Sequence, residues 1–202
     1  MRVITEYDLA MPEGWHPLPV TPADQQWASV LAQQIIGGAE TIEEAPELLA
    51  RQLLEVKAAV DATQVTGTRT AVLVTDPTTP FLDAMFTIVL GRGTSPEKYD
   101  AQLERVVDEV DTAQVMGRQT IEGEVPGGKV RGAQFLIGHL PADEFTAGAH
   151  LEERVHLGVF PEDTSDMVDV TIIAANAGLF TDLPATAVGM LQNLTVRTEG
   201  AA

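Results

Sequence analysis

The feature that most constrains the fold of this chain is the spacing of its apolar residues, which changes near residue 118. From there to residue 160 apolar and polar residues alternate, as in strands whose two faces differ. The segments 118–125 and 129–138 flank Pro126-Gly127-Gly128, which has the composition of a hairpin turn. Segment 151–160 alternates in the same way. Strands joined by short turns predict an antiparallel sheet.

Two earlier segments, Thr70–Thr75 and Ala84–Leu90, are apolar without alternation. Such strands are covered on both faces, so we expect them in the middle of the sheet with helices on both sides. Val3–Met11 and Met167–Ala175 are predicted as further strands.

Helical spacing predicts four helices, which begin near Thr21, Ala45, Ser95 and Leu183. Thr21 and Ser95 are N-cap residues, and each is followed by a proline that suits the first helical position. The expected buried faces consist of Trp27, Val30, Leu31 and Ile35; Leu49, Leu53, Val56 and Val60; Tyr99, Leu103, Val106 and Val110; and Leu183, Ala187, Leu191 and Leu194.

The element order, with no linker or repeat, predicts one α+β domain over residues 1–202, with an antiparallel sheet, helices on both faces and a frayed tail at 197–202. A chain of 202 residues can bury a core of its own without a metal or a disulfide. It contains no cysteine, which excludes thiolate catalysis and thiolate metal sites.

The formal net charge of −18 argues against nucleic acid and anionic membranes as partners, because binding phosphate needs clustered lysine and arginine. The dispersed acids indicate a solvated, self-repelling surface, the alternative being a site for a basic partner. No segment approaches the length of a membrane helix, and Met1–Asp8 does not resemble a signal peptide. We therefore expect a cytoplasmic protein, unless a leader is missing from this sequence.

The turn Pro12-Glu13-Gly14-Trp15, the order of the elements and a closing strand followed by a helix resemble the PsbP/Mog-like fold. Small actinobacterial proteins and some mycobacterial lipoproteins look similar. The resemblance implies an αβα sandwich and a role in binding or assembly, as in photosystem subunits and a nuclear-transport factor. It implies no catalytic residues, and fold alone does not establish function.

No motif indicates catalysis, a cofactor or a metal. Gly123 to Lys129 has the spacing of a phosphate loop, but Val130 replaces the magnesium-binding hydroxyl residue and the segment lies between two strands. Ser95 lacks the context of a hydrolase nucleophile, and Gly91-Arg92-Gly93 lacks the third glycine of a dinucleotide motif.

The four histidines, His16, His139, His150 and His156, do not have the spacing of a helical metal pair. His150 and His156 share a strand face but are about 20 Å apart at ~3.3 Å per residue. Glu152 and Glu153 are neighbours on one strand, so they point to opposite faces and cannot act as a pair.

Trp15 is the one candidate for binding a partner, as an exposed aromatic anchor. The alternative is that its ring packs over a sheet edge and fixes the loop. The function hypothesis is a non-enzymatic protein-binding or assembly module, which a sheet edge also allows to form a homodimer. The alternative is a carrier of a small apolar ligand in a pocket between helices and sheet; an enzyme that uses dispersed carboxylates is a third.

Overall fold

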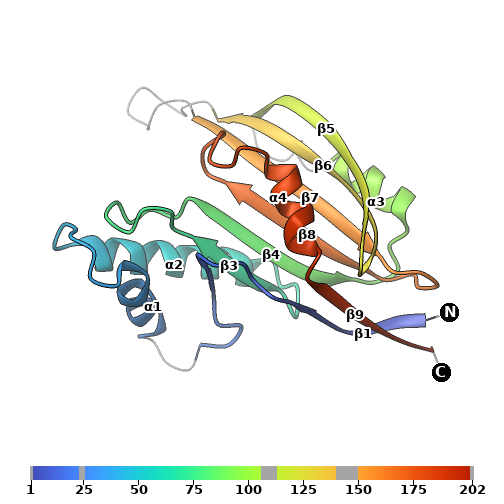
Figure 1. Cartoon of the computed structure of the whole chain (residues 1–202), viewed down its shortest axis with the longest axis horizontal. Helices are drawn as coiled ribbons and strands as arrows, with labels where there is room; N and C mark the ends of the chain where they lie inside the picture. The colour runs from blue at the N-terminus through green and yellow to red at the C-terminus, as the bar shows by residue number, and fades with distance from the viewer. Residues whose placement is uncertain (1, 23–25, 106–112, 140–149, 201–202) are drawn as a thin grey trace. The chain divides into compact units, whose positions relative to one another are not determined.

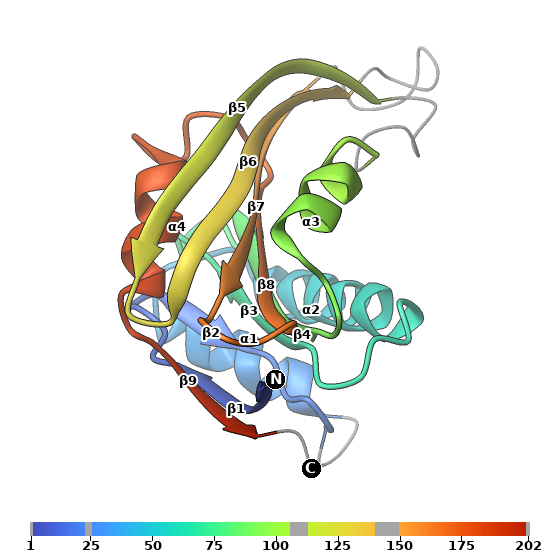
Figure 2. The ribbon, with the colours of Figure 1, turned by 90° about the vertical axis from the view of Figure 1, so that its right-hand side faces the viewer.

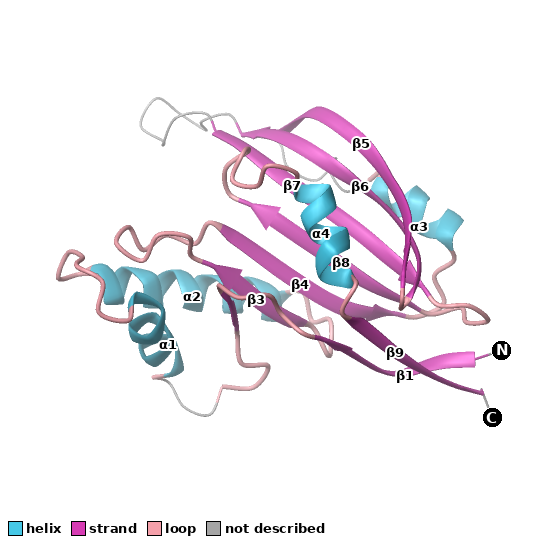
Figure 3. Ribbon diagram, viewed as in Figure 1, coloured by secondary structure: helices cyan, strands magenta, loops and turns pink. Residues whose placement is uncertain are grey.

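The structure, a computed structural model, describes residues 2–22, 26–105, 113–139 and 150–200. Within these residues the chain forms four helices and nine strands (Figures 1 and 3). The strand pairs whose register is known are antiparallel, and a single parallel bridge joins Arg2 to Thr164. The prediction of an α+β protein with antiparallel strands is confirmed.

Contacts divide the chain into two compact units, where the sequence predicts one domain. One unit is residues 13–89, and the other combines residues 1–12 with 90–202. The boundary after Val89 falls inside a continuous strand, β4 (Ala84–Gly91), rather than in a linker. One cooperative domain therefore stays a prediction.

The unit of residues 13–89 has β3 as its central strand, paired antiparallel with β2 and β4. Its elements are β2 (Trp15–Pro17), α1 (Trp27–Ile36), α2 (Ala45–Ala62), β3 (Arg69–Leu73) and β4 (Ala84–Gly91). The apolar face of α2, with Leu49 and Leu53, packs with α1 against Val72 and Val74. The apolar residues at helical spacing thus form the core of this unit.

The second unit contains two ladders of strands. Strands β8, β7, β6 and β5 are neighbours in that order, and β1 pairs with β9. Its elements are β1 (Arg2–Leu9), α3 (Pro96–Leu103), β5 (Ala113–Val125), β6 (Gly128–His139), β7 (His150–Phe160), β8 (Met167–Ala174), α4 (Leu183–Leu191) and β9 (Leu194–Gly200). The β5–β6 turn requires Gly128, because its φ is 138° and a Cβ there would lie 2.3 Å from the Phe160 carbonyl oxygen.

Helices α3 and α4 lie on opposite sides of strands β5–β8, as Figure 2 shows. Tyr99 and Leu103 of α3 pack against Phe135 and other apolar residues of β6, whereas α4 contacts β5 and β7. Whether one sheet of the whole chain carries helices on both faces, as in the PsbP/Mog-like fold, stays a prediction.

Three sequence predictions need correction or completion. Helix α1 begins at Trp27 rather than after Thr21, since residues 21 and 22 are not helical. The tail does not fray from residue 197, because β9 pairs with β1 as far as Gly200. The predicted continuation of α3 to Val106 and Val110 lies outside the described residues.

Candidate functional site

Trp15 is buried, with 8% of its surface exposed. It lies on β2 opposite Leu73 of β3, and its ring meets the edge of the Phe86 ring at 6.1 Å between centroids. An aromatic anchor for a partner needs an exposed ring. The geometry therefore supports the alternative, in which Trp15 packs over the sheet edge and holds the loop.

The other tryptophan, Trp27, borders an open groove on the same unit. The groove has a volume of about 470 Å³ and lies between the segment after β2 and one face of α1. We call it the α1 groove; its lining is Pro17, Leu18, Pro19, Trp27, Val30, Leu31 and Gln34. Six of these seven side chains are apolar, and Val30 is 49% exposed.

The spacing of apolar residues predicts that Trp27, Val30 and Leu31 lie on the buried face of a helix, so it does not predict the groove. Trp27 and Leu31 are only partly buried against the core, while Ala28 and Ala32 of the same helix are fully buried. The small residues thus let the helix pack closely on the core of this unit, and the large residues beside them stay near the surface. In the sequence, the alanines at positions 28 and 32 are the signal that this face of the helix packs on the core and that the larger residues beside it stay near the surface.

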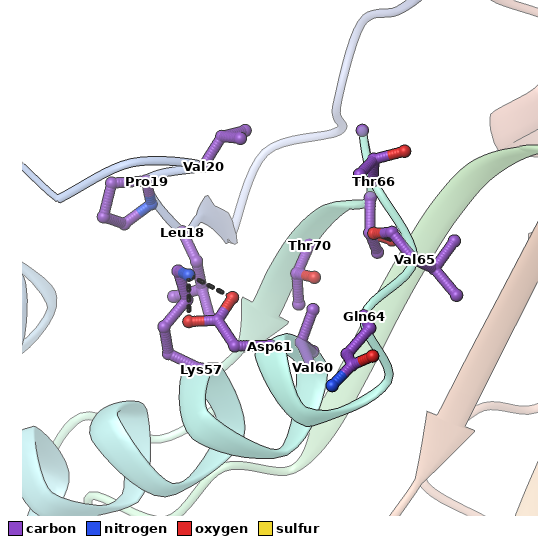
Figure 4. A pocket seen from close by; sticks show the side chains of 12 residues that line it. Leu18, Pro19, Val20, Lys57, Val60, Asp61, Gln64, Val65, Thr66 and Thr70 are labelled. Atoms are coloured by element: carbon purple, nitrogen blue, oxygen red, sulfur yellow. Dashed lines mark hydrogen bonds and ion pairs between the residues drawn. The ribbon is translucent and has the colours of Figure 1, made fainter.

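A smaller pocket lies at the C-terminal end of α2 (Figure 4). Its volume is about 230 Å³, and the Lys57 ammonium on its wall is 2.5 Å from the Asp61 carboxylate. The buried hydroxyl of Thr70 has no hydrogen-bond partner among the described residues. The pocket is smaller than the ~300 Å³ at which ligand sites usually begin, and its two charges already neutralise each other, so we assign it no function.

The segments rejected as catalytic motifs have structural roles. The phosphate-loop pattern of Gly123 to Lys129 is the β5–β6 hairpin, as predicted. The Ser95 side chain accepts a hydrogen bond from the Lys98 amide at 3.3 Å, which confirms it as the N-cap of α3. Arg92 forms an ion pair with Asp166 at 2.5 Å.

Two histidines that lie apart in the sequence, His139 and His150, are stacked. The rings of His139 on β6 and His150 on β7 lie 4.6 Å apart and nearly parallel, because these residues face each other across the two strands. Nε2 of His139 is 3.1 Å from Glu152. Among the described residues no three acidic or histidine side chains gather as a metal site requires. The stacking depends on the register of β6 and β7, which spacing along one strand does not reveal.

Polar groups inside the same unit have strongly shifted pKa values. Burial raises the pKa of Asp169 to about 6, although the Tyr99 hydroxyl donates a hydrogen bond to it at 3.0 Å. Burial, with a smaller effect of Arg154, lowers the pKa of His156 to about 4. Gly158 makes room for the rings of Phe160 and Tyr99, since a Cβ there would lie 2.7 Å from the first and 3.1 Å from the second. We interpret the polar groups with shifted pKa values as interior groups, because they line none of the described clefts.

Comparison with known proteins does not assign this chain to a family. No model of a protein family matches the chain, and no curated protein matches it. The resemblance to the PsbP/Mog-like fold therefore stays a prediction. No helix in the described part of the chain is both long and apolar enough to cross a membrane.

Proposed function

We propose that this chain is a non-enzymatic protein-binding module, and that the α1 groove receives an apolar segment of its partner. The observation that carries the proposal is the exposed apolar lining of the groove. Val30 is half exposed, and Trp27 and Leu31 beside it are partly exposed. Aromatic and aliphatic side chains at a surface are typical of the centre of a protein interface.

The shape of the α1 groove favours a protein segment over a small ligand. Small-molecule sites bury about 70–90% of their ligand and so need walls on several sides. Here the described lining comes from two segments only, residues 17–19 and one face of α1. An open groove of this kind accommodates an apolar segment of a peptide.

The test is a selection of peptides from a random library on the purified chain, compared between two variants. Val30→Asp places a charge in the groove, and Leu54→Asp is its matched control. Leu54 is also helical, lies in the same unit and is 47% exposed, but it does not line the groove. We expect peptides with bulky apolar anchors, at least tenfold weaker binding to Val30→Asp, and binding within twofold of the parent for Leu54→Asp.

Trp27 provides a direct readout, because its fluorescence should change when a peptide fills the groove while the buried Trp15 stays constant. Enrichment of no peptide, or equal binding to both variants, would contradict the proposal. Binding of the neutral probe N-phenyl-1-naphthylamine that Val30→Asp abolishes, without any peptide binding, would instead establish the alternative of a carrier for a small apolar ligand.

A homodimer through a sheet edge belongs to the same proposal, and β5 is the strand concerned. It is the outermost strand of its ladder, with 13 residues that are mostly exposed. Arg118 and Glu122 lie on one face of β5. In an antiparallel pair of β5 strands with its twofold axis at Thr120, Arg118 of one copy would lie opposite Glu122 of the other. Sedimentation of the purified chain measures whether this pairing occurs.

A further inference from the structure

Two consecutive glutamates of β7 are buried to the same extent on opposite faces of the strands. Glu152 is 9% exposed and Glu153 is 8% exposed. Glu152 contacts Arg154 and His139, whereas Glu153 accepts a hydrogen bond from the side-chain amide of Gln134. The prediction that the two carboxylates point apart is confirmed, and each has its own surroundings.

The charge of Glu152 is balanced by a neighbouring cation. Nε and Nη2 of Arg154 lie 2.7 and 2.6 Å from its Oε1. The guanidinium therefore binds one carboxylate oxygen through two nitrogens, and His139 contacts the other oxygen. Such charge-assisted contacts offset the cost of burying the carboxylate.

Glu153 has no such balance. Within the described residues of its unit, no lysine, arginine or histidine side chain forms an ion pair with it. The Gln134 amide is neutral, so it provides a hydrogen bond but no opposite charge. A buried carboxylate without a cation costs free energy, and that cost falls when a cation binds beside it.

The Glu153 side chain lines a cleft of about 460 Å³ between the strands and the loop that precedes α4. We call it the Glu153 cleft. Gln119, Gln134 and Leu136 line it from β5 and β6, and Ala177 and Phe180 line it from the loop. Arg118 also borders the cleft, but its guanidinium pairs with Glu104 at 2.5 Å and lies over the Phe135 ring.

From these contacts we propose that the Glu153 cleft binds a primary ammonium or guanidinium group on a short aliphatic chain. The carboxylate supplies the charge, the side-chain amides supply hydrogen bonds, and Leu136 and Phe180 supply apolar surface for the chain. An aromatic ring next to a cation adds attraction through its π face. The net charge of −18 raises the local concentration of cations around the whole protein.

The matched variants are Glu153→Gln and Glu152→Gln, which remove one charge each from adjacent buried positions without changing side-chain size. Calorimetric titration with n-butylammonium and with agmatine gives the affinity of each protein, and n-butanol is the uncharged control ligand. We expect Glu153→Gln to weaken amine binding at least tenfold, about 1.4 kcal/mol. Glu152→Gln should bind within twofold of the parent, and n-butanol should not bind.

The amine has two possible sources, a free small molecule or a basic side chain of a partner, and two further ligands separate them. The peptides acetyl-Gly-Lys-Gly-amide and acetyl-Gly-Arg-Gly-amide carry the same groups on a backbone. Binding that depends on Glu153 supports the proposal with either kind of ligand, and the tighter ligand identifies the source. No binding, or equal weakening in both variants, overturns it.

Stability provides a readout that does not need the ligand. Glu153→Gln should raise the urea midpoint, because it removes an unbalanced buried charge, whereas Glu152→Gln should lower it, because Arg154 loses its partner. A lower midpoint for Glu153→Gln would show that its charge is already balanced, and that also overturns the proposal. Val30 does not line the Glu153 cleft, so the proposal for the α1 groove and the proposal for the Glu153 cleft can be contradicted independently of each other.

Discussion

At the scale of single residues, Asp169 shows how burial links this protein's stability to pH. The carboxyl lies on β8 and accepts the Tyr99 hydroxyl, yet burial raises its pKa from 3.8 to about 6. Between these two values the folded state holds a proton that the unfolded state has released. The contribution of Asp169 to the free energy of unfolding therefore falls as the pH rises through this window.

Asp169→Asn removes this dependence and keeps an oxygen that can accept the Tyr99 hydrogen bond. At pH 8 we expect the variant to be more stable than the parent by about 3 kcal/mol, since the pKa differs by about two units between the folded and unfolded states and one unit corresponds to about 1.4 kcal/mol. At pH 3.5 the two proteins should be nearly equal in stability, because the carboxyl is then mostly protonated in both the folded and the unfolded state. Urea unfolding at the two pH values measures the difference, and a gap that does not change with pH would exclude the assigned pKa shift.

The position of Trp15 shows what residue-level reasoning could and could not predict. Its neighbours in the sequence are prolines and a glycine, which predict a turn and leave the exposure of the ring open. Burial is decided by Leu73 and Phe86, more than 50 residues away in the sequence. For the same reason neither the stacked histidines nor the unbalanced charge of Glu153 could be recognised from the sequence, because both depend on cross-strand neighbours.

At the scale of elements, Asp166 connects β1 to the ends of β4 and β8. Its carboxylate accepts hydrogen bonds from the Ile4 amide at 3.0 Å and from Arg92 at 2.5 Å, and Arg92 also donates to the Ile4 carbonyl. Burial by itself would raise the pKa of Asp166, but these hydrogen bonds outweigh it and hold the pKa below its usual value. The stabilisation is present above the unfolded-state pKa of 3.8 and is lost as the pH falls through the lower folded-state value.

Asp166→Ala should therefore destabilise the protein by about 2–3 kcal/mol at pH 7, the range for a buried charged hydrogen bond. Amide exchange should rise most in β1, because the Ile4 amide loses its partner. Glu6→Gln is the control on the same strand. It breaks an exposed pair with Arg197, which should cost less than about 1 kcal/mol. Equal effects of the two substitutions would mean that Asp166 does not hold β1 in place.

Elements with a local signal were predicted well, and those that depend on distant partners were not. The apolar runs predicted β3 and β4, and the turn at Pro126 predicted the β5–β6 hairpin. Strand β9 was missed because Leu194 and Val196 are its only large apolar residues, and its partner lies at the other end of the sequence. The predicted start of helix α1 was too early, because Thr21-Pro22 matches an N-cap pattern, whereas the N-cap residue in the structure is Gln26.

At the scale of the whole molecule, the division into two units poses the question of cooperativity. Both tryptophans, Trp15 and Trp27, belong to the unit of residues 13–89. Tryptophan fluorescence therefore reports that unit, while far-ultraviolet circular dichroism reports helices and strands of both. Because β4 runs through the boundary without a linker, we expect the two signals to change at the same urea concentration. Separate midpoints would establish two domains that unfold independently.

The pairing of β1 with β9 has a consequence for how the protein is made. About 185 residues separate Leu9 from its partner Leu194. At translation rates of about 5–20 residues per second, the first strand waits roughly 10–40 s for the last one to be synthesised. During that interval the residues of β1 lack their pairing partner β9. The charges of Glu6 and Asp8 disfavour association of this segment with other nascent chains.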